Sequence, residues 1–295
     1  MKYHLVALFT IGVWGMTFVS TKVLLTDVSP LWILLLRFAL GLLVLCAIRP
    51  HVLKLRHGKD ELLFAAAGAT GIASYYLLEN VALVYASATS VGVIVAASPL
   101  FTALFSTAFG DRSSMNARFF CGFALAMAGL VVVGVGATGH EGAMDFAGPA
   151  AFGDLLALAA AFVWAVYSTL VARIAGRGYE TIAATKRTFV WGVAFILAAT
   201  LAFDPHPPQV DALLNWRAAL NLVFLGAVAS AACFVSWSVA VKHLGATVTA
   251  TYIYLVPAIT ATASVIILGE PLNAPIVAGL VMTIAGLLLS QGPRR

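Results

Sequence analysis

A carboxylate and an amide, Glu79 and Asn80, are neighbours within the otherwise apolar stretch YYLLENVALVYASATS, residues 75–90. A charged side chain at the centre of a membrane-inserted helix costs roughly 2.5–3.5 kcal/mol, so it is expected to face water or a partner group. Glu79 can serve as a hydrogen-bonded neutral acid, as the partner of a cation, or as a site that carries a proton. A structural polar contact between helices is the alternative to a role in binding.

Arg37 is the second costly charge, about two turns into an apolar run that begins near residue 30. It can reach Glu79, extend its stem to the membrane surface, or contact an anionic group of a bound solute. We favour a structural or gating ion pair, and we therefore assign Arg37 and Glu79 as the gating or ion-pair candidates.

Aromatic residues are numerous within the apolar runs, and two tryptophans lie at matched positions in mid-run. Belts of Trp and Tyr at membrane surfaces are the usual explanation for such rings, but they do not account for Trp14 and Trp164. Rings with an apolar face and a polar edge suit a cavity for amphipathic solutes. Core packing is the alternative for each ring.

Two prolines, Pro99 and Pro257, fall within apolar runs, where each would free a backbone carbonyl in mid-helix. Such positions suit a hinge and a cavity wall, and a packing kink is the alternative. The candidate cavity residues are Trp14, Thr17, Tyr75, Tyr76, Glu79, Asn80, Ser98, Pro99, Trp164, Tyr167, Ser168, Trp237, Tyr252 and Pro257.

The sequence carries no signature of a metal site, a cofactor or an enzyme. Its three cysteines and six histidines are scattered, without the spacing of a disulfide framework or a metal centre. It has no Gly-rich phosphate loop, no GxSxG and no HExxH. We therefore expect no cofactor, no catalytic residue and no use of ATP by the chain itself.

The composition indicates that the bilayer is the solvent of this chain. Of 295 residues, 62% are hydrophobic and 10% are charged, whereas an average soluble domain carries about 25% charged residues. Runs of roughly 20 apolar residues are long enough to cross a membrane. We predict ten spans, at residues 4–22, 30–49, 62–84, 87–109, 117–137, 150–172, 183–203, 218–241, 246–268 and 274–291.

The basic residues predict the orientation. Placing the N-terminus in the cytoplasm leaves only Lys22 and Arg217 outside, with Arg37 inside the membrane. The positive-inside rule then puts both termini in the cytoplasm. Because the basic residues are spread through short loops, they form no groove for nucleic acid. The cytoplasmic set is Lys2, Arg49, Lys54, Arg56, Lys59, Arg112, Arg118, Arg173, Arg177, Lys186, Arg187, Lys242, Arg294 and Arg295.

The two halves of the chain resemble each other. ASATSVGVIVAASPL matches LGATVTATYIYLVPA, and MNARFFCGFALAMAGL matches LNAPIVAGLVMTIAGL, with small residues at corresponding positions that favour close helix approach. We predict two five-helix repeats, residues 1–138 and 149–295, which together form one membrane-embedded transport domain. Since five is odd, the second repeat must be inverted, an arrangement typical of secondary transporters.

These features resemble the drug/metabolite transporter superfamily in its ten-helix EamA-type branch, which includes YddG-like amino-acid exporters. The resemblance covers nearly the whole chain and rests on the WG at Trp14, RFALG, ENVALVYASAT, the two prolines and GEPLN at Gly269–Asn273. In the first repeat the acid equivalent to that of GEPLN is Asp111, a mild departure. The resemblance implies an all-α polytopic membrane protein that exports a small metabolite, amino acid or drug.

We thus expect a secondary transporter of the inner membrane that exports small amphipathic metabolites, above all amino acids, by alternating access through a central cavity. The alternative is a proton-coupled antiporter of cationic drugs or metabolites that uses Glu79. An intramembrane enzyme or scaffold is disfavoured by the inverted repeat. The expected partners are a small-molecule substrate and the lipid bilayer, without nucleic acid, and we expect a monomer.

Overall fold

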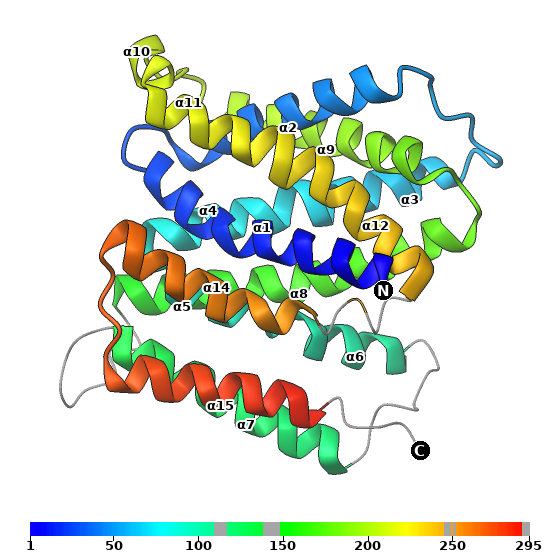
Figure 1. The fold of residues 1–295 in the computed structure, drawn as a ribbon. Helices are drawn as coiled ribbons and strands as arrows, with labels where there is room; N and C mark the ends of the chain where they lie inside the picture. The colour runs from blue at the N-terminus through cyan, green and yellow to red at the C-terminus, as the bar shows by residue number, and fades with distance from the viewer. Residues whose placement is uncertain (109–116, 138–147, 245–248, 250–251, 291–295) are drawn as a thin grey trace.

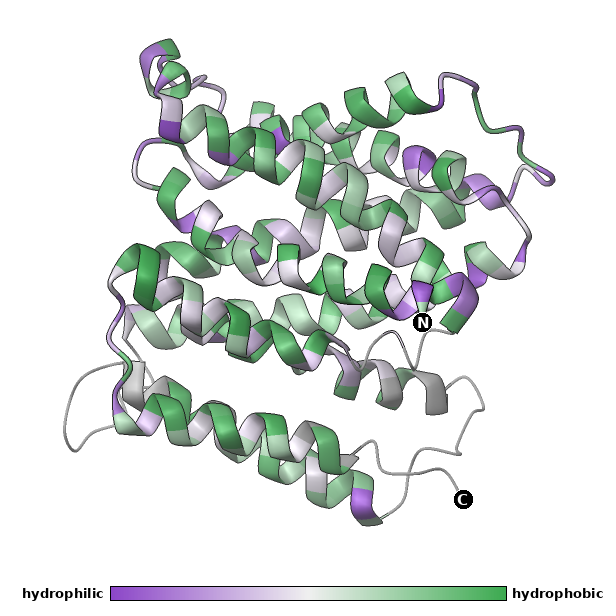
Figure 2. Ribbon diagram, viewed as in Figure 1, coloured by the Kyte–Doolittle hydropathy of each residue, from purple (hydrophilic) through white to green (hydrophobic). Residues whose placement is uncertain are grey.

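Helices form every regular element of the residues that the computed structural model describes, namely 1–108, 117–137, 148–244, 249 and 252–290 (Figure 1). Asp111, Arg112, Arg294 and Arg295 lie outside the described residues, as does most of the stretch between the two predicted repeats. Figure 2 shows that apolar residues cover the helices, whereas polar residues gather at helix ends and in loops.

The first part of the chain contains α1 (Lys2–Leu24), α2 (Pro30–Ile48), α3 (Asp60–Ala67), the π-helix η1 (Gly68–Ser74), α4 (Tyr75–Tyr85), α5 (Ala88–Val95), α6 (Ser98–Ala108) and α7 (Ala117–Ala137). The second part contains α8 (Pro149–Gly176), α9 (Thr181–Phe203), α10 (Val210–Leu214), α11 (Trp216–Val223), the π-helix η2 (Phe224–Ala232), α12 (Cys233–Leu244), the 3-10 helix η3 (Tyr252–Leu255), α14 (Val256–Ala263), the π-helix η4 (Ser264–Leu268) and α15 (Ala274–Ser290).

Within the described residues, six helices are long and apolar enough to cross a membrane. They are α1, α2, the continuous run α3–η1–α4, α8, α9 and the continuous run α11–η2–α12. Four shorter apolar stretches accompany them, at Ala88–Thr102, Ala117–Val133, Tyr252–Leu268 and Ala274–Gly286. Each predicted apolar run overlaps one of these helical stretches, so the all-helical, polytopic class is confirmed.

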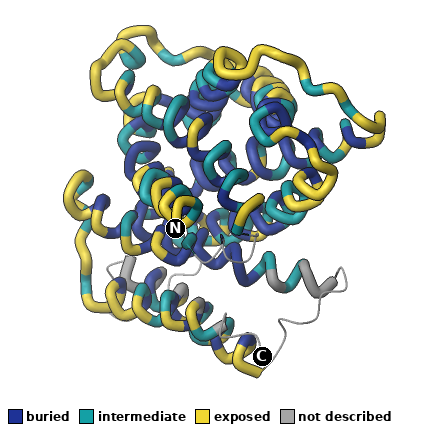
Figure 3. The backbone as a smooth tube through the Cα atoms, turned by 45° about the vertical axis from the view of Figure 1, so that its right-hand side comes forward, coloured by how far each residue is buried: buried dark blue, intermediate teal, exposed yellow. Residues whose placement is uncertain are grey.

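Helices α7 and α15 form a pair at one edge of the bundle, with exposed outer faces (Figures 1 and 3). Small residues bring the two backbones together, as the sequence predicts. A Cβ atom on Gly279 would lie 2.6 Å from the carbonyl oxygen of Gly129, and one on Gly286 would lie 2.6 Å from that of Gly122. A side chain at these glycines would therefore push the pair apart.

The two prolines lie at helix starts rather than inside continuous helices, which corrects the expectation of freed mid-helix carbonyls. Pro99 is the second residue of α6, and residues 96–97 separate α6 from α5. Pro257 is the second residue of α14, which follows η3. Proline is tolerated in the first turn of a helix because the N–H group that it lacks has no intrahelical partner there.

Figure 3 shows that the most buried backbone lies inside the bundle, and many of the buried side chains are aromatic. Phe38, Phe189 and Phe234 are almost completely buried, and their rings contact one another at centroid distances of 5.1–6.1 Å. They come from α2, α9 and α12. This aromatic core supports the side chains that line the cavities described next.

Candidate functional site

A cavity of about 40 Å³ lies among α1, α4, α8, the junction of α5 with α6, and the η3–α14 segment. Residues Val95 and Ala96, at the end of α5, form part of its wall, so the interruption before Pro99 opens onto the cavity. The predicted cavity residues that line it are Trp14, Thr17, Tyr75, Tyr76, Glu79, Ser98 and Trp164.

A second cavity of about 30 Å³ lies next to the first, and Trp164 and Ile253 line both. Its predicted members are Pro99, Trp164, Tyr167, Ser168 and Trp237. A buried water needs about 10–15 Å³ of such volume, so each cavity has room for a few waters. The single central cavity expected from the sequence is therefore divided in this conformation, with Trp164 and Ile253 between the two parts.

Trp14 and Trp164 meet directly, with ring centroids 5.6 Å apart in an edge-to-face arrangement. The Trp14 Nε1–H donates to the carbonyl oxygen of Ala229, 3.0 Å away in η2. Tyr75 lies 4.7 Å from Trp164, and Trp237 lies 5.1 Å from Trp14. The matched tryptophans of the two halves thus form the centre of one aromatic cluster.

Phe234 belongs to the same cluster, although the sequence analysis did not single it out. Its ring lies 5.6 Å from that of Trp14 and 6.4 Å from that of Trp164. The available signal was its position three residues before Trp237, because residues i and i+3 share a helix face. Because phenylalanine is common in membrane helices, the spacing of Phe234 and Trp237 was not enough to identify Phe234 as a site residue.

Glu79 lies in the wall of the first cavity with 1% of its surface exposed. Tyr75, one turn earlier on α4, contacts the carboxylate. The other carboxylate oxygen, Oε1, is buried and has no hydrogen-bond partner among the described residues. A buried acceptor without a donor costs free energy. A hydrogen-bond donor bound in the cavity would remove this cost.

Arg37 is completely buried, and it does not pair with Glu79 in this conformation. Its Nε–H donates to Ser230 Oγ at 3.3 Å. The guanidinium carbon lies 4.5 Å from the centroid of the Tyr76 ring, in cation–π contact. No direct ion pair joins Arg37 to Glu79 in this conformation of the described residues, although the Arg37 charge acts on the Glu79 carboxylate. A gating role for the two residues stays a prediction.

Three other candidates line neither cavity. Asn80 turns towards α2, where its Nδ2 donates to the carbonyl oxygen of Pro30 at 3.1 Å. The Tyr252 hydroxyl lies 2.5 Å from Nδ1 of His4. Pro257 is the second residue of α14 and follows Val256, which lines the first cavity. One helical step of 100° separates Glu79 from Asn80, which is why only one of them reaches the cavity.

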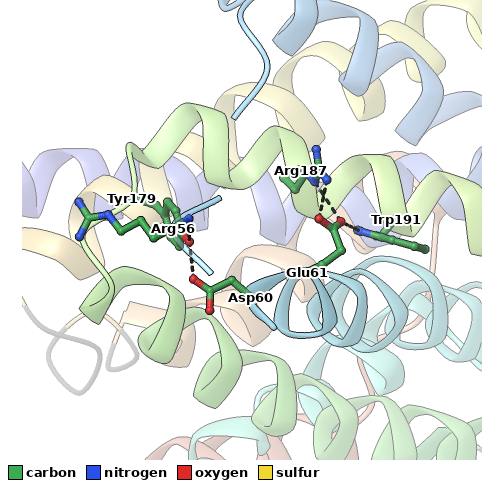
Figure 4. A network of polar contacts seen from close by, with 6 residues as sticks. All are labelled: Arg56, Asp60, Glu61, Tyr179, Arg187 and Trp191. Atoms are coloured by element: carbon green, nitrogen blue, oxygen red, sulfur yellow. Dashed lines mark hydrogen bonds and ion pairs between the residues drawn. The ribbon is translucent and has the colours of Figure 1, made fainter. Parts of the chain in front are cut away.

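A network of polar contacts, drawn in Figure 4, lies near the start of α3, at the end of the bundle that also holds the N-terminus in Figure 1. Arg187 forms two hydrogen bonds with Glu61, at 3.0 and 2.5 Å, and Trp191 donates to the same carboxylate. Asp60 accepts from the Tyr179 hydroxyl and pairs with Arg177. These contacts connect the start of α3 with α9 and with the α8–α9 connection.

A second polar cluster closes the opposite end. Glu270 accepts hydrogen bonds from the backbone N–H groups of Ala88 and Thr89, at 2.8 and 3.2 Å, and from Thr89 Oγ1 at 2.9 Å. Lys22 donates to the carbonyl oxygens of Leu83 and Ala86. The sequence analysis quoted Glu270 only within GEPLN and did not foresee its partners, because they are backbone groups distant in sequence.

The described residues contain no group of three His, Cys, Asp or Glu side chains that could hold a metal ion. The site is therefore built from an aromatic cluster, one acid with an unused oxygen and hydroxyl groups. Such a wall can enclose an amphipathic molecule and accept a hydrogen bond from it.

The family model described as "EamA-like transporter family" matches residues 1–135 and 151–291 of this chain. An uncharacterized transporter of Archaeoglobus fulgidus is 27% identical, over 98% of this chain and 97% of that protein. A probable terminal-alkyne amino-acid exporter of Streptantibioticus cattleyicolor is 28% identical, over 95% of this chain and 90% of that protein.

The aromatic amino acid exporter YddG of Salmonella typhimurium is 26% identical, over 77% of this chain and 76% of that protein. One solved crystal structure, 21% identical in sequence, covers 98% of this chain and 96% of its own with a TM-score of 0.71. The two chains therefore share a fold. The names of the family and of these relatives are those of transporters rather than enzymes.

Proposed function

The chain belongs to the EamA-like transporter family, and we propose that it is a secondary transporter that exports small amphipathic metabolites, above all amino acids, by alternating access. The observation that carries the proposal is the pair of adjoining cavities lined by Trp14, Tyr75, Trp164 and Trp237. Polar clusters lie at both ends of the bundle, where the two gates of an alternating-access cycle would stand. Two relatives are named as amino-acid exporters.

The proposal includes two inverted repeats, residues 1–138 and 149–295. Three observations support it. The family model matches each half separately. π-helical segments occur in the third apolar run of each half, at η1 and η2. The proline of each fourth run is the second residue of its helix, α6 or α14. With the positive-inside rule, this scheme puts both termini in the cytoplasm. We further propose an inner-membrane location and a monomeric state.

In this mechanism the substrate occupies the space that opens when Trp164 and Ile253 separate. Each cavity alone is too small for an amino acid, so binding must join them. The cluster around Glu61 and Arg187 would form the cytoplasmic gate, and the cluster around Glu270 would form the outer gate. Opening one gate while the other stays closed gives alternating access.

A second candidate is a proton-coupled antiporter of cationic drugs or metabolites, and the unused oxygen of Glu79 favours it. In that case protons and cations would compete for one carboxylate. An imposed pH gradient would then drive cation movement, whereas an amino-acid exporter without proton coupling would respond only to the substrate gradient.

The test is counterflow in proteoliposomes. Vesicles loaded with unlabelled phenylalanine should accumulate external labelled phenylalanine faster than protein-free vesicles, with competition from other amphipathic amino acids. A cell-based screen with toxic amino acids and cationic dyes would extend the test to other solutes. No counterflow of any amino acid by folded protein, together with pH-driven dye movement, would replace the first candidate with the second.

A further inference from the structure

We infer that Glu79 binds the ammonium group of the solute that enters the first cavity, and that this site selects for an ammonium group rather than for a carboxylate. The inference deepens the proposed function and rests on it, because it treats the cavity as a place where a solute binds. It identifies the charged group by which that solute is recognised.

The first step is the hydrogen-bonding capacity of Glu79. The side chain is 1% exposed and lines the cavity, and its Oε1 has no donor among the described residues. In its ionised form the carboxylate only accepts hydrogen bonds, so the group that completes the site around this form is a donor. An ammonium group carries three donors and the opposite charge. It is also about as large as a water molecule, which fits a cavity of about 40 Å³.

The second step is the set of rings around the carboxylate. Trp14, Tyr75, Tyr76 and Trp164 line the same cavity as Glu79. The Tyr75 ring lies 4.7 Å from those of both Tyr76 and Trp164. The face of an aromatic ring attracts a cation, and tryptophan does so most strongly. A purely structural role for Glu79 would explain neither the carboxylate oxygen that has no hydrogen-bond donor nor the aromatic rings around it.

The third step is the position of Arg37. Its guanidinium lies against the Tyr76 ring, and Arg37 is not part of the cavity wall. Among the described residues that line the first cavity, none is a lysine, arginine or histidine. A carboxylate that entered the cavity would therefore meet the acid Glu79 and no cationic side chain in the wall itself. The carboxylate of an amino acid is expected to stay outside this part of the site.

The experiment compares three probes that share a phenylethyl body: L-phenylalanine, 2-phenylethylamine and 3-phenylpropanoate. Binding to the full, detergent-solubilised chain is measured by the rise in melting temperature over a range of concentrations. The amine and the amino acid should stabilise the protein, and 3-phenylpropanoate should not. Glu79→Gln should weaken binding of the amine roughly 10- to 100-fold, as expected for loss of a charge-assisted hydrogen bond.

The matched control is Glu180→Gln, which removes the same group from an exposed ion pair with Arg49. It should bind all three probes as the wild type does. Glu79→Asp keeps the charge and should retain part of the affinity. If Glu79→Gln does not fold, the comparison of 2-phenylethylamine with 3-phenylpropanoate on the wild-type chain still decides whether the site prefers an ammonium group to a carboxylate.

The inference is overturned if 3-phenylpropanoate stabilises the wild type as well as the amine does, if Glu79→Gln binds the amine normally, or if no probe stabilises the wild type. Counterflow of phenylalanine is measured in parallel. If the amine binds through Glu79 but no amino acid is transported, the proposed export function fails and the ammonium site stands. If Glu79→Gln transports phenylalanine as fast as the wild type does, the ammonium site at Glu79 fails and the proposed export function stands.

Discussion

Replacing Glu270 with glutamine should favour opening of the bundle at the end opposite the N-terminus. Gly269 has a positive φ of 67° and ends η4, which places Glu270 against the first residues of α5. There the carboxylate accepts the three hydrogen bonds from Ala88 and Thr89. Lys22 adds an attractive charge nearby. These contacts hold the segment before α15 to the start of α5, so they stabilise the closed state of this end.

The size of the effect follows from the number and kind of these contacts. Hydrogen bonds to a charged group contribute about 1.5–3 kcal/mol each when buried, but Glu270 is only partly buried. Replacing a helix-capping acceptor costs about 0.5–2 kcal/mol. Glutamine keeps one carbonyl oxygen and loses the charge, so we expect the closed state to lose about 1–2 kcal/mol. The open population should then rise roughly 5- to 30-fold.

The assay is labelling of a cysteine placed in the first cavity. Thr17→Cys is suitable because Thr17 lines that cavity, and the native Cys46, Cys121 and Cys233 are replaced beforehand. A membrane-impermeant maleimide is added on the side opposite the N-terminus. When labelling is limited by the open population, Glu270→Gln should increase its rate by the same roughly 5- to 30-fold.

The matched control is again Glu180→Gln, at the other end of the bundle, which should leave this rate unchanged. An unchanged rate in folded Glu270→Gln protein would show that these hydrogen bonds do not govern access from that end. A similar increase in both variants would point to general loosening of the bundle rather than to a gate.

Other predictions concern the cluster, the helix pair and the topology. Trp14→Ala and Trp164→Ala should each reduce transport at least about tenfold while reducing folded yield less, because the rings line the cavities and meet at their centre. Gly279→Leu should lower the melting temperature, with a cost of about 1–3 kcal/mol, because even its Cβ has no room. Reporter fusions at Lys54 should indicate the cytoplasm, and fusions at Pro207 the opposite side.

Each of these has its own control. Phe203→Ala, at an exposed position of α9, should leave transport unchanged, and full activity of both tryptophan variants would make the cluster a packing feature. Gly12→Ala adds a Cβ where nothing lies within 4 Å, so it should not cause the loss expected at Gly279. A cytoplasmic signal at Pro207 would contradict the inverted repeat.

The helical course of the chain could be predicted closely, because hydropathy depends only on composition along a run. The first predicted span, residues 4–22, lies within α1, and the predicted span 183–203 lies within α9. The π-helical segments η1 and η2 could not be predicted. A π-helix has more residues per turn than an α-helix, but the run of apolar residues that forms it has the same hydropathy. The position of each proline at a helix start likewise depends on where the preceding helix ends.

The candidate site was predictable in part. Trp14 and Trp164 were identified by their matched positions in the two halves, and the structure brings them together. Asn80 was included because it adjoins Glu79, but a helix turns adjacent residues to different neighbours, and Asn80 contacts Pro30 instead. The partner of Arg37 could not be predicted, because the choice between Glu79 and the Tyr76 ring depends on how α2 packs on α4.

Small residues that line neither cavity help decide which rings meet, so the arrangement of such a site cannot be read from any single helix. A Cβ atom on Gly71 of η1 would lie 2.1 Å from Cδ2 of Tyr167, so the Tyr167 ring occupies the space that a side chain at residue 71 would fill. That contact lets α8 approach η1 closely, and Trp164, one turn before Tyr167, thereby reaches Trp14 and Tyr75. The shape of the second cavity thus depends on a residue that lines neither cavity. A pattern of rings gives the members of the cluster, but the glycines on neighbouring helices set the distances between them.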